Sequence, residues 1–476
     1  YLNNYRKNQP MPDAETEWQL DSMLIKMLNV DAVNAFAKQT ILPTNQVIVI
    51  NAPEKEGVAT PTAEEILAIR DKVAASEVTA YEDNVVKEPL IAEGTVLKGS
   101  PVKKTVEDKQ LGTTEWTLAN GAKVVVKPTT FKADEVRLGV VGKGGLSLLS
   151  DEEYYMGEMM PAVNSMSGVG KFSATELKKQ LSGKTASVQP SVENYTSAMG
   201  GVCSPKDIET MLQLLYLNFT QPRFNKDDVD NLTKMLLAQL ANAKSNPDFL
   251  MQEKVADVTY GHNPRRQMIS TEIVNKFDFE QLPGIYAKLY PGANGFVFTL
   301  AGNIDPETLK PLVEKYIGSI PAAKKPIDYV DDKAYPVKGE VTEEFTAPMQ
   351  QPKVSVSYYF SGEMPYTLKN KMALTFLTQA LNSRYLVKEI EEIAANGPKS
   401  EDIEKNREFM LKSWKNSLEQ NGAWMSYIQI KYGSGLNYIA DHEQAIRDLT
   451  NADVQALAKK ILADGNLVKV VMRPSK

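Results

Sequence analysis

A stretch near the beginning of this chain recurs at its end, and this repeat constrains the fold more than any other feature. Moving Ile25–Lys55 by 421 positions lays it over Ile446–Lys476 without a gap. Each copy has the pattern of an amphipathic helix that ends in Ala-Lys, a short turn that carries an Asn, and an alternating strand that stops at a Pro. A repeated unit of this kind indicates duplicated domains. Identical positions include Leu28/Leu449, Val33/Val454, Ala35/Ala456, Ala37/Ala458, Lys38/Lys459, Asn45/Asn466, Val47/Val468, Val49/Val470, Pro53/Pro474 and Lys55/Lys476.

The first copy ends at Lys55, which leaves too little chain before it for a whole domain. Residues 1–53 are therefore expected to be the carboxy-terminal tail of a preceding domain, made of helices and a final strand around Val47 and Val49. Such a tail needs a partner surface on which to bury its apolar side chains. The sequence thus predicts a piece of a longer protein.

Composition excludes two classes of function. The net charge of −6 argues against a nucleic-acid surface, which needs clustered Lys and Arg. No apolar run approaches the roughly 20 residues that a membrane-spanning helix requires, so no membrane span is expected. The hydrophobic content of 42% is ordinary for globular domains, and 476 residues predict two to four of them.

Changes in composition divide the chain further. Residues 54–112 are rich in Glu, Lys, Pro, Thr and Ala and are predicted to be a linker with one helix. A first domain is expected over residues 113–330, because Asn120-Gly121 between two alternating runs is a strong hairpin signal. A second domain is expected over residues 340–476, with strands at Lys353–Phe360 and Leu467–Met472.

Several strings in these domains resemble the pitrilysin/insulinase family of zinc metallopeptidases. They are Trp116-Thr-Leu-Ala-Asn-Gly-Ala-Lys-Val-Val-Val, the strand ending in Gly144-Gly145, Ser167-Gly-Val-Gly-Lys-Phe-Ser with Glu176-Leu, Leu215-Tyr-Leu-Asn-Phe-Thr-Gln-Pro-Arg-Phe224, and the region from Lys353 through Asn382-Ser-Arg-Tyr-Leu386. The resemblance covers nearly the whole chain.

The resemblance implies four homologous domains in two halves that are joined by a linker and close around a peptide. On that template this chain is the end of the first half, the linker and the whole second half. The implied fold class is α+β: two homologous domains, each a mostly antiparallel sheet with helices on one face, as in the mitochondrial processing peptidase, preceded by a helix–strand tail.

The family's zinc motif is absent from the matching helix. The motif is His-x-x-Glu-His, in which two His on one helix face bind the metal and the Glu activates its water. Aligning Gly157 with the family's Gly puts Met160, Val163 and Asn164 where His, Glu and His would stand. No metal site is therefore predicted in this chain, and this helix face is expected to pack in the core.

Other reactive side chains have simpler explanations. His262 and His442 stand 180 residues apart and neither has an acid-rich helical partner at i+4, so His262 is interpreted as a solvated or backbone-bonded loop side chain. Cys203 is the single cysteine and is interpreted as a buried, inert thiol. No substrate-binding residue is assigned.

These observations predict the non-catalytic half of a zinc metallopeptidase. It would form chamber wall and peptide-binding surface, with zinc in an amino-terminal half, and with that half and a peptide substrate as its partners. The alternatives are a separate inactive subunit, as in the processing peptidase, and a catalytically dead scaffold or peptide-binding subunit of the same fold. The orphan tail and linker favour a piece of one polypeptide, which alone would be inactive. The resemblance favours a bacterial periplasm or cell envelope.

One departure from the family pattern concerns residues 386/387. Relatives resemble Arg-Glu-x-x-Gly-x-x-Tyr after the helix that ends near Leu386, followed by two strands, whereas here the chain passes directly to Val387-Lys-Glu-Ile. Without those strands the second domain would have only two, fewer than the three or so that usually give a stable sheet. We therefore expect about 40 or more residues to be missing between Leu386 and Val387.

Overall fold

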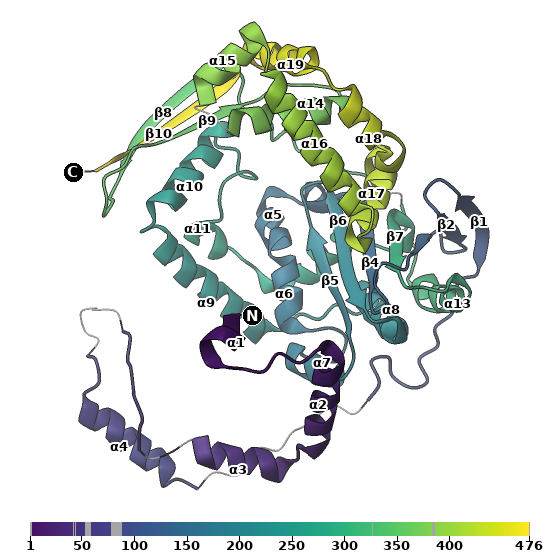
Figure 1. Ribbon diagram of the computed structural model, residues 1–476, viewed down its shortest axis with the longest axis vertical. Coiled ribbons are helices and arrows are strands. Elements are labelled where there is room, and N and C mark those ends of the chain that lie inside the picture. The colour runs from purple at the N-terminus through teal and green to yellow at the C-terminus, as the bar shows by residue number, and fades with distance from the viewer. Residues whose placement is uncertain are drawn as a thin grey trace. The chain divides into compact units, whose positions relative to one another are not determined.

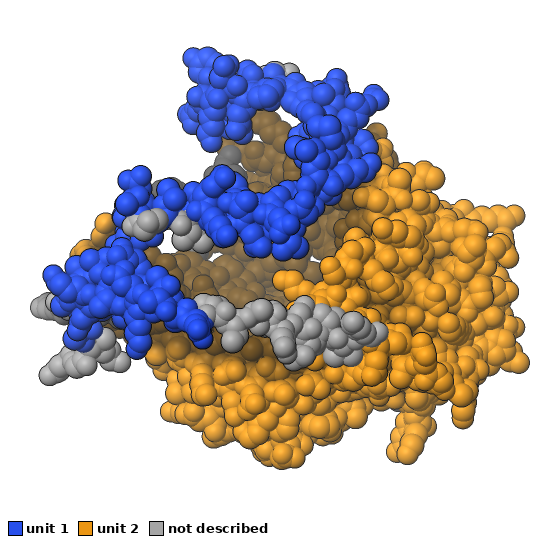
Figure 2. Space-filling model, turned by 90° about the horizontal axis from the view of Figure 1, so that it is seen from below, with its two compact units in different colours: residues 1–83 blue, residues 84–476 orange. Residues whose placement is uncertain are grey.

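The computed structural model describes residues 2–40, 42, 44–52, 59–77, 88–325, 327–382 and 386–475. It contains two compact units, residues 1–83 and residues 84–476 (Figures 1 and 2). Each unit is described by itself.

The first unit consists of helices without a core. They are α1 (Leu2–Lys7), α2 (Ala14–Met27), α3 (Val30–Thr40) and α4 (Ala63–Ala74), and none of them has a buried residue. The strand expected around Val47 and Val49 does not form in the described residues 44–52, where these side chains are 88% and 83% exposed. That expectation was wrong because a strand needs a neighbour with which to pair, and the described part of this unit supplies none.

The second unit begins with a seven-stranded sheet in the order β1-β2-β3-β7-β4-β6-β5 (Figure 1). All neighbouring pairs are antiparallel except β3 with β7. The hairpin predicted at Asn120-Gly121 joins β2 to β3, and Gly121 has φ +86°, which a residue with a side chain rarely adopts. The strands are β1 (Val102–Asp108), β2 (Thr113–Leu118), β3 (Lys123–Pro128), β4 (Val136–Lys143), β5 (Ala186–Val192), β6 (Thr196–Cys203) and β7 (Phe296–Gly302).

Strand β1 corrects the prediction that residues 54–112 are all linker. Its residues pair antiparallel with β2, with one register shift between Val102 and Lys104, and the N–H of Val102 donates to Glu314 Oε1 at 2.8 Å. Leu90, further upstream, is buried in the same core. The strand was missed because its central residues, Lys103 to Glu107, are exposed and carry mostly polar side chains.

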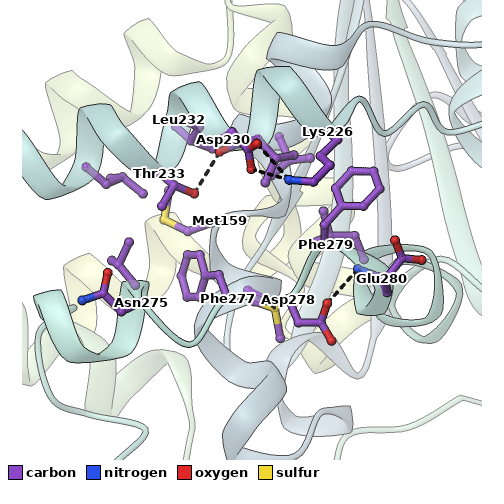
Figure 3. A pocket seen from close by; sticks show the side chains of 16 residues that line it. Met159, Lys226, Asp230, Leu232, Thr233, Asn275, Phe277, Asp278, Phe279 and Glu280 are labelled. Atoms are coloured by element: carbon purple, nitrogen blue, oxygen red, sulfur yellow. Dashed lines mark hydrogen bonds and ion pairs between the residues drawn. The ribbon is translucent and has the colours of Figure 1, made fainter.

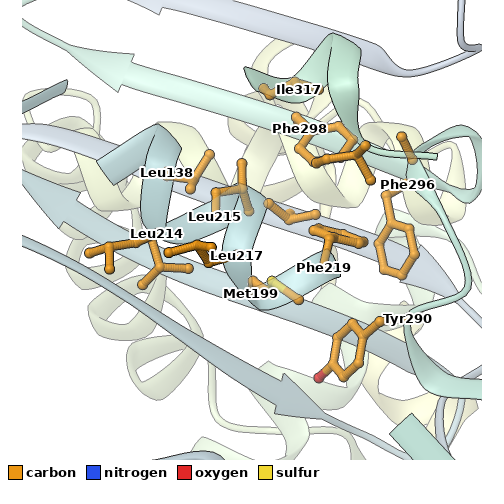
Figure 4. Close-up of a cluster of buried hydrophobic side chains, with 14 of the residues drawn as sticks. Leu138, Met199, Leu214, Leu215, Leu217, Phe219, Tyr290, Phe296, Phe298 and Ile317 are labelled. Atoms are coloured by element: carbon orange, nitrogen blue, oxygen red, sulfur yellow. The ribbon is translucent and has the colours of Figure 1, made fainter. Parts of the chain in front are cut away.

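Helices cover one face of this sheet and bury a large apolar core. Figure 4 shows its centre, where Leu214, Leu215 and Leu217 of one helix meet Leu138 and other strand side chains. The helices of this part of the chain are α5 (Asp151–Glu158), α6 (Met160–Ser167), α7 (Ala174–Gln180), α8 (Ile208–Thr220), α9 (Lys226–Ala243), α10 (Pro247–Thr259), α11 (Thr271–Val274), α12 (Leu282–Leu289) and α13 (Pro306–Tyr316), of which α10 lies outside this layer.

A second sheet of three strands follows, in the order β8-β10-β9. Strand β10 (Leu467–Pro474) pairs parallel with β8 (Glu340–Ala347) and antiparallel with β9 (Ser355–Phe360). The sequence analysis missed β8, because Glu343 occupies an inward position between Val341 and Phe345. Its carboxylate lies 3.8 Å from the Lys254 ammonium of α10.

The final helix and strand agree with the repeat. Over residues 446–476 the chain ends α18, forms α19 and then enters β10, so a helix followed by a strand is confirmed for this copy. The helices of this part are α14 (Leu368–Asn382), α15 (Leu386–Asn396), α16 (Ser400–Ser417), α17 (Asn421–Ser434), α18 (Tyr438–Asp448) and α19 (Asn451–Asp464).

The missing segment was expected between Leu386 and Val387, and both residues belong to the first turn of α15 (Leu386–Asn396), directly after residues 383–385, which lie outside the described residues. One reason for expecting it is nevertheless removed: with β8 the second sheet has three strands, as many as a stable sheet usually needs. The gap itself stays a prediction.

The two sheets exchange helices across the second unit. Helix α10 follows the first sheet's strand β6 in the chain but packs on the second sheet, where Val258 joins Val468 and Val470 in a small core. Helix α17 comes from the later part of the chain but packs on β4 and β7, on the face of the first sheet opposite its helical layer. Each sheet is thus covered on one face by a helix from the other half of the unit.

Candidate functional site

The helix expected to carry the family's metal motif is two helices. Ser150 caps α5 through a capping box with Glu153, and Met159 ends α5 and begins α6. Pro161 stands in the first turn of α6, where its missing N–H is harmless, and this explains why one helix of about fifteen residues is broken.

The three motif positions lie on α6 and are almost fully buried. Met160 is 0% exposed, Val163 3% and Asn164 5%. Met160 and Val163 belong to the large core, so they pack as an apolar face. Asn164 differs, because neither its Nδ2 nor its Oδ1 has a hydrogen-bond partner.

This donor set does not fit a zinc ion. Zinc takes thiolate, imidazole or carboxylate ligands, and a thioether, an isopropyl group and a neutral amide offer none of these. Within the described ranges, no group of three or more His, Cys, Asp or Glu side chains is placed to hold a metal ion.

Helix α6 has a hollow on each side. The larger, of about 460 Å³, lies between α5, α6, α9 and the segment from α11 to Leu282, and is lined by apolar side chains such as Met159, Leu232 and Phe277 (Figure 3). Lys226 and Asp230 of α9 form an ion pair at 2.8 Å on its wall. Its chemistry is that of an apolar binding pocket.

The smaller hollow, of about 170 Å³, lies on the other side of α6, between α6, α7, α8 and strand β5. Asn164 and Gly168 line it from α6 and its cap, and Val188 lines it from β5. We call it the Asn164 cavity. The unbonded amide was missed by sequence analysis, because hydrogen-bond partners depend on tertiary neighbours and no local pattern reports them.

The other candidate side chains are far from catalytic arrangements. Cys203 is fully buried on β6, and burial raises the pKa of its thiol to about 12, so it is protonated and unreactive. The imidazole of His262 is largely exposed and its Nδ1 lies 2.8 Å from Asp257 Oδ2. His442 packs between the rings of Trp414 and Tyr438, and burial lowers its pKa to about 4.

No helix among the described residues is long and apolar enough to cross a membrane.

Comparison with known proteins agrees with this architecture. Residues 276–392 match the family model described as the Peptidase M16 inactive domain. A "Zinc protease PQQL-like" protein of Arabidopsis thaliana is 22% identical over 377 residues, which is 76% of this chain and 36% of that protein.

Solved structures show the same fold. The periplasmic protease PqqL from Escherichia coli superposes with a TM-score of 0.70 at 16% identity, over 100% of this chain and 57% of that chain. A peptidase M16 inactive domain from Pseudomonas fluorescens gives a TM-score of 0.60 at 17% identity, over 76% of this chain and 98% of that chain.

The fold is accordingly α+β with two homologous domains, and the chain spans about two fifths of the length of curated relatives such as the PqqL zinc protease of Escherichia coli, at 40%. The chain thus has the fold of the M16 peptidases, the pitrilysin/insulinase family, is similar in sequence to PqqL-like zinc proteases, and matches the inactive domain of that family over residues 276–392.

Proposed function

We propose that this chain is the non-catalytic half of a zinc-dependent metallopeptidase and forms the wall and peptide-binding surface opposite a zinc-bearing half. The observation that carries the proposal is an intact peptidase fold with Met160, Val163 and Asn164 packed at the motif positions. A fold kept without its metal ligands retains shape and surface, and these are what a chamber wall contributes.

The partner of this half is the catalytic half of the same polypeptide. The first unit supports this, because the helices α2 and α3 carry large apolar side chains that remain exposed, among them Trp18 at 71% and Phe36 at 69%. Exposed apolar surface of this extent marks an interaction site. We assign it to the preceding domain, with residues 1–53 as that domain's tail.

The domain division follows from the same proposal. Residues 113–330, extended by β1, form the first domain of the inactive half, and residues 340–476 form the second. Peptides are the substrate class, and a periplasmic or envelope location is supported by the similarity to PqqL of Escherichia coli, a periplasmic protease.

Metal analysis and peptide cleavage test the proposal. The chain alone is expected to hold no stoichiometric zinc and to leave a fluorogenic peptide intact, whereas the gene product extended upstream to the length of its relatives binds zinc and cleaves it. Addition of a chelator to the extended protein is the control and should abolish cleavage. Zinc held by the chain alone, or an extended protein without zinc, contradicts the proposal; the second result would favour the catalytically dead scaffold.

A further inference from the structure

Strand β5 is an open edge of the seven-stranded sheet. It is the last strand in the sheet order, and among the described residues it pairs only with β6. An unpaired edge presents backbone donors and acceptors that an added strand can use.

The register shows which groups are free. The N–H of Glu193 donates to Thr196 C=O at 2.8 Å, and the N–H of Ser204 donates to Thr185 C=O at 2.9 Å. In an antiparallel pair the residues bonded to the neighbour alternate, so odd-numbered residues of β5 turn toward β6. Ala186 and Val188 therefore turn their N–H and C=O away from the sheet, and no other described residue donates to or accepts from them.

Pro190 limits the part of this edge to which an added strand can bond. Pro190 has no N–H, so the edge lacks one donor there. Ala186 and Val188 keep theirs, and both residues line the Asn164 cavity. The residues with unpaired backbone groups are therefore also residues that line the cavity.

The cavity offers one polar group among apolar walls. Leu177, Leu181 and Leu214 line it together with Val188, and Asn164 reaches it from α6. The Asn164 residue is 5% exposed and both polar atoms of its amide lack partners, which is rare for a buried amide. An amide presents two N–H donors and one acceptor oxygen, so a second amide complements it with two hydrogen bonds.

We propose that an extended peptide adds to β5 as a further strand and places a Gln or Asn side chain in the Asn164 cavity. The backbone of Ala186 and Val188 binds the peptide main chain, and Asn164 pairs with the side-chain amide while the leucines surround its stem. The proposal rests on the proposed function only for the source of the peptide, a substrate of the assembled peptidase.

The first test uses the unaltered chain and a labelled, capped heptapeptide, Lys-Thr-Val-Gln-Val-Thr-Lys. Binding is measured by fluorescence anisotropy for this peptide and for one with Leu in place of Gln. The Gln peptide should bind at least tenfold more tightly, because the Leu peptide leaves the Asn164 amide unpaired. Equal affinity, or no binding of either peptide, overturns the proposal.

Backbone methylation of the same peptide tests strand addition. N-methyl groups at one alternate set of residues should abolish binding, because those N–H groups face β5, and N-methyl groups at the other set should leave it unchanged. Equal effects of both sets would show that the peptide does not pair with the edge.

The variant Asn164→Leu separates binding from structure. It should bind the Gln peptide at least tenfold more weakly and reverse the preference toward Leu, while the Tm stays the same or rises, since a buried unpaired amide is removed. Ser191→Leu, at an exposed position on β5 that does not line the cavity, is the matched control and should change neither property. A lower Tm with an unchanged Gln preference would assign Asn164 a purely structural role.

The outcomes distinguish this inference from the proposed function. Register-dependent peptide binding by a chain whose extended form has no zinc would contradict the proposed function alone. If the extended protein is active but the chain binds both sets of N-methylated peptides equally, only the strand addition is contradicted.

Discussion

At the residue scale, single polar groups connect parts of the second unit that are far apart in sequence. The Glu135 carboxylate accepts from Arg137 Nη2 at 2.9 Å and from Asn421 Nδ2 at 3.1 Å, and Asn421 Oδ1 accepts from the Thr129 hydroxyl at 2.5 Å. The hydrogen bond from Arg137 is the main cause that lowers the pKa of Glu135 to about 2. Asn421 begins α17, so this network holds that helix to the first sheet.

The network predicts a loss of stability in acid. Because the pKa of Glu135 is lower in the folded chain than its ordinary 4.5, its contribution is complete above about pH 4.5 and is lost as the pH falls toward 2. Glu135→Gln should lower the free energy of unfolding at pH 7 by about 1–3 kcal/mol and flatten its pH dependence in this window. Urea unfolding at pH 7 and pH 3 measures both. An unchanged pH dependence in the variant would assign the acid sensitivity to other carboxylates.

His442 predicts a second, separate pH window. Burial lowers its pKa from 6.5 to about 4, so the folded chain disfavours the proton and stability should fall as the pH drops from about 6.5 to 4. The loss should be roughly 1–3 kcal/mol for one partly buried imidazole. His442→Phe, which keeps the ring contacts with Trp414 and Tyr438, should retain its Tm between pH 6.5 and 4.5 while the unaltered chain loses several degrees. If the Tm of the variant falls with pH as much as that of the unaltered chain, the prediction is wrong.

At the element scale, local signals predicted some elements and tertiary pairing decided others. Asn120-Gly121 encodes its own turn, so the β2–β3 hairpin could be read directly. Strand β8 could not, because Glu343 interrupts its apolar positions, and the Lys254 ammonium that lies 3.8 Å from this carboxylate belongs to a helix far away in the sequence. The burial of Met160 and Val163 was predictable from their apolar character, whereas the unpaired amide of Asn164 and the open edge of β5 depend on neighbours brought together by the fold.

The contact of α17 with the sheet predicts the effect of one substitution. A Cβ on Gly139 of β4 would lie 2.2 Å from Gln429 Nε2 and 2.4 Å from Met425 Cε, both on α17. Gly139→Val should therefore push the ends of these two side chains aside, loosen the packing of α17 on β4 and destabilise the chain by about 1–3 kcal/mol. Hydrogen exchange should become faster in α17 than in α8, which packs on the opposite face. Gly200→Val, at a position with no atom within 4 Å of a Cβ, is the control and should leave α17 protected.

At the scale of the whole molecule, the exchange of α10 and α17 makes the two domains of the second unit interdependent. Val258 of α10 is buried against Val468 and Val470 of the second sheet, and Lys127 of β3 lies 3.9 Å above the ring of Trp424 on α17. Each domain alone would therefore lack a helix that covers its sheet.

This interdependence predicts the behaviour of fragments. Residues 88–335 and 336–476 expressed separately should aggregate or bind a hydrophobic dye, because each exposes a sheet face that the other covers. Co-expressed, the two fragments should purify together and melt as one transition. The intact chain is the reference, and two soluble monomeric fragments with sharp melting transitions would show that the domains fold independently.

The exposed apolar helices of the first unit have a consequence for genetics. In this chain the side chains of Trp18 and Phe36 face water and make few contacts. A substitution at either position therefore removes little packing from the isolated chain and should leave its melting curve unchanged. If these helices pack on a preceding domain, as we propose, such an allele would do harm only on assembly with that domain. Loss-of-function scans scored by the thermal stability of this chain would therefore classify these positions as neutral.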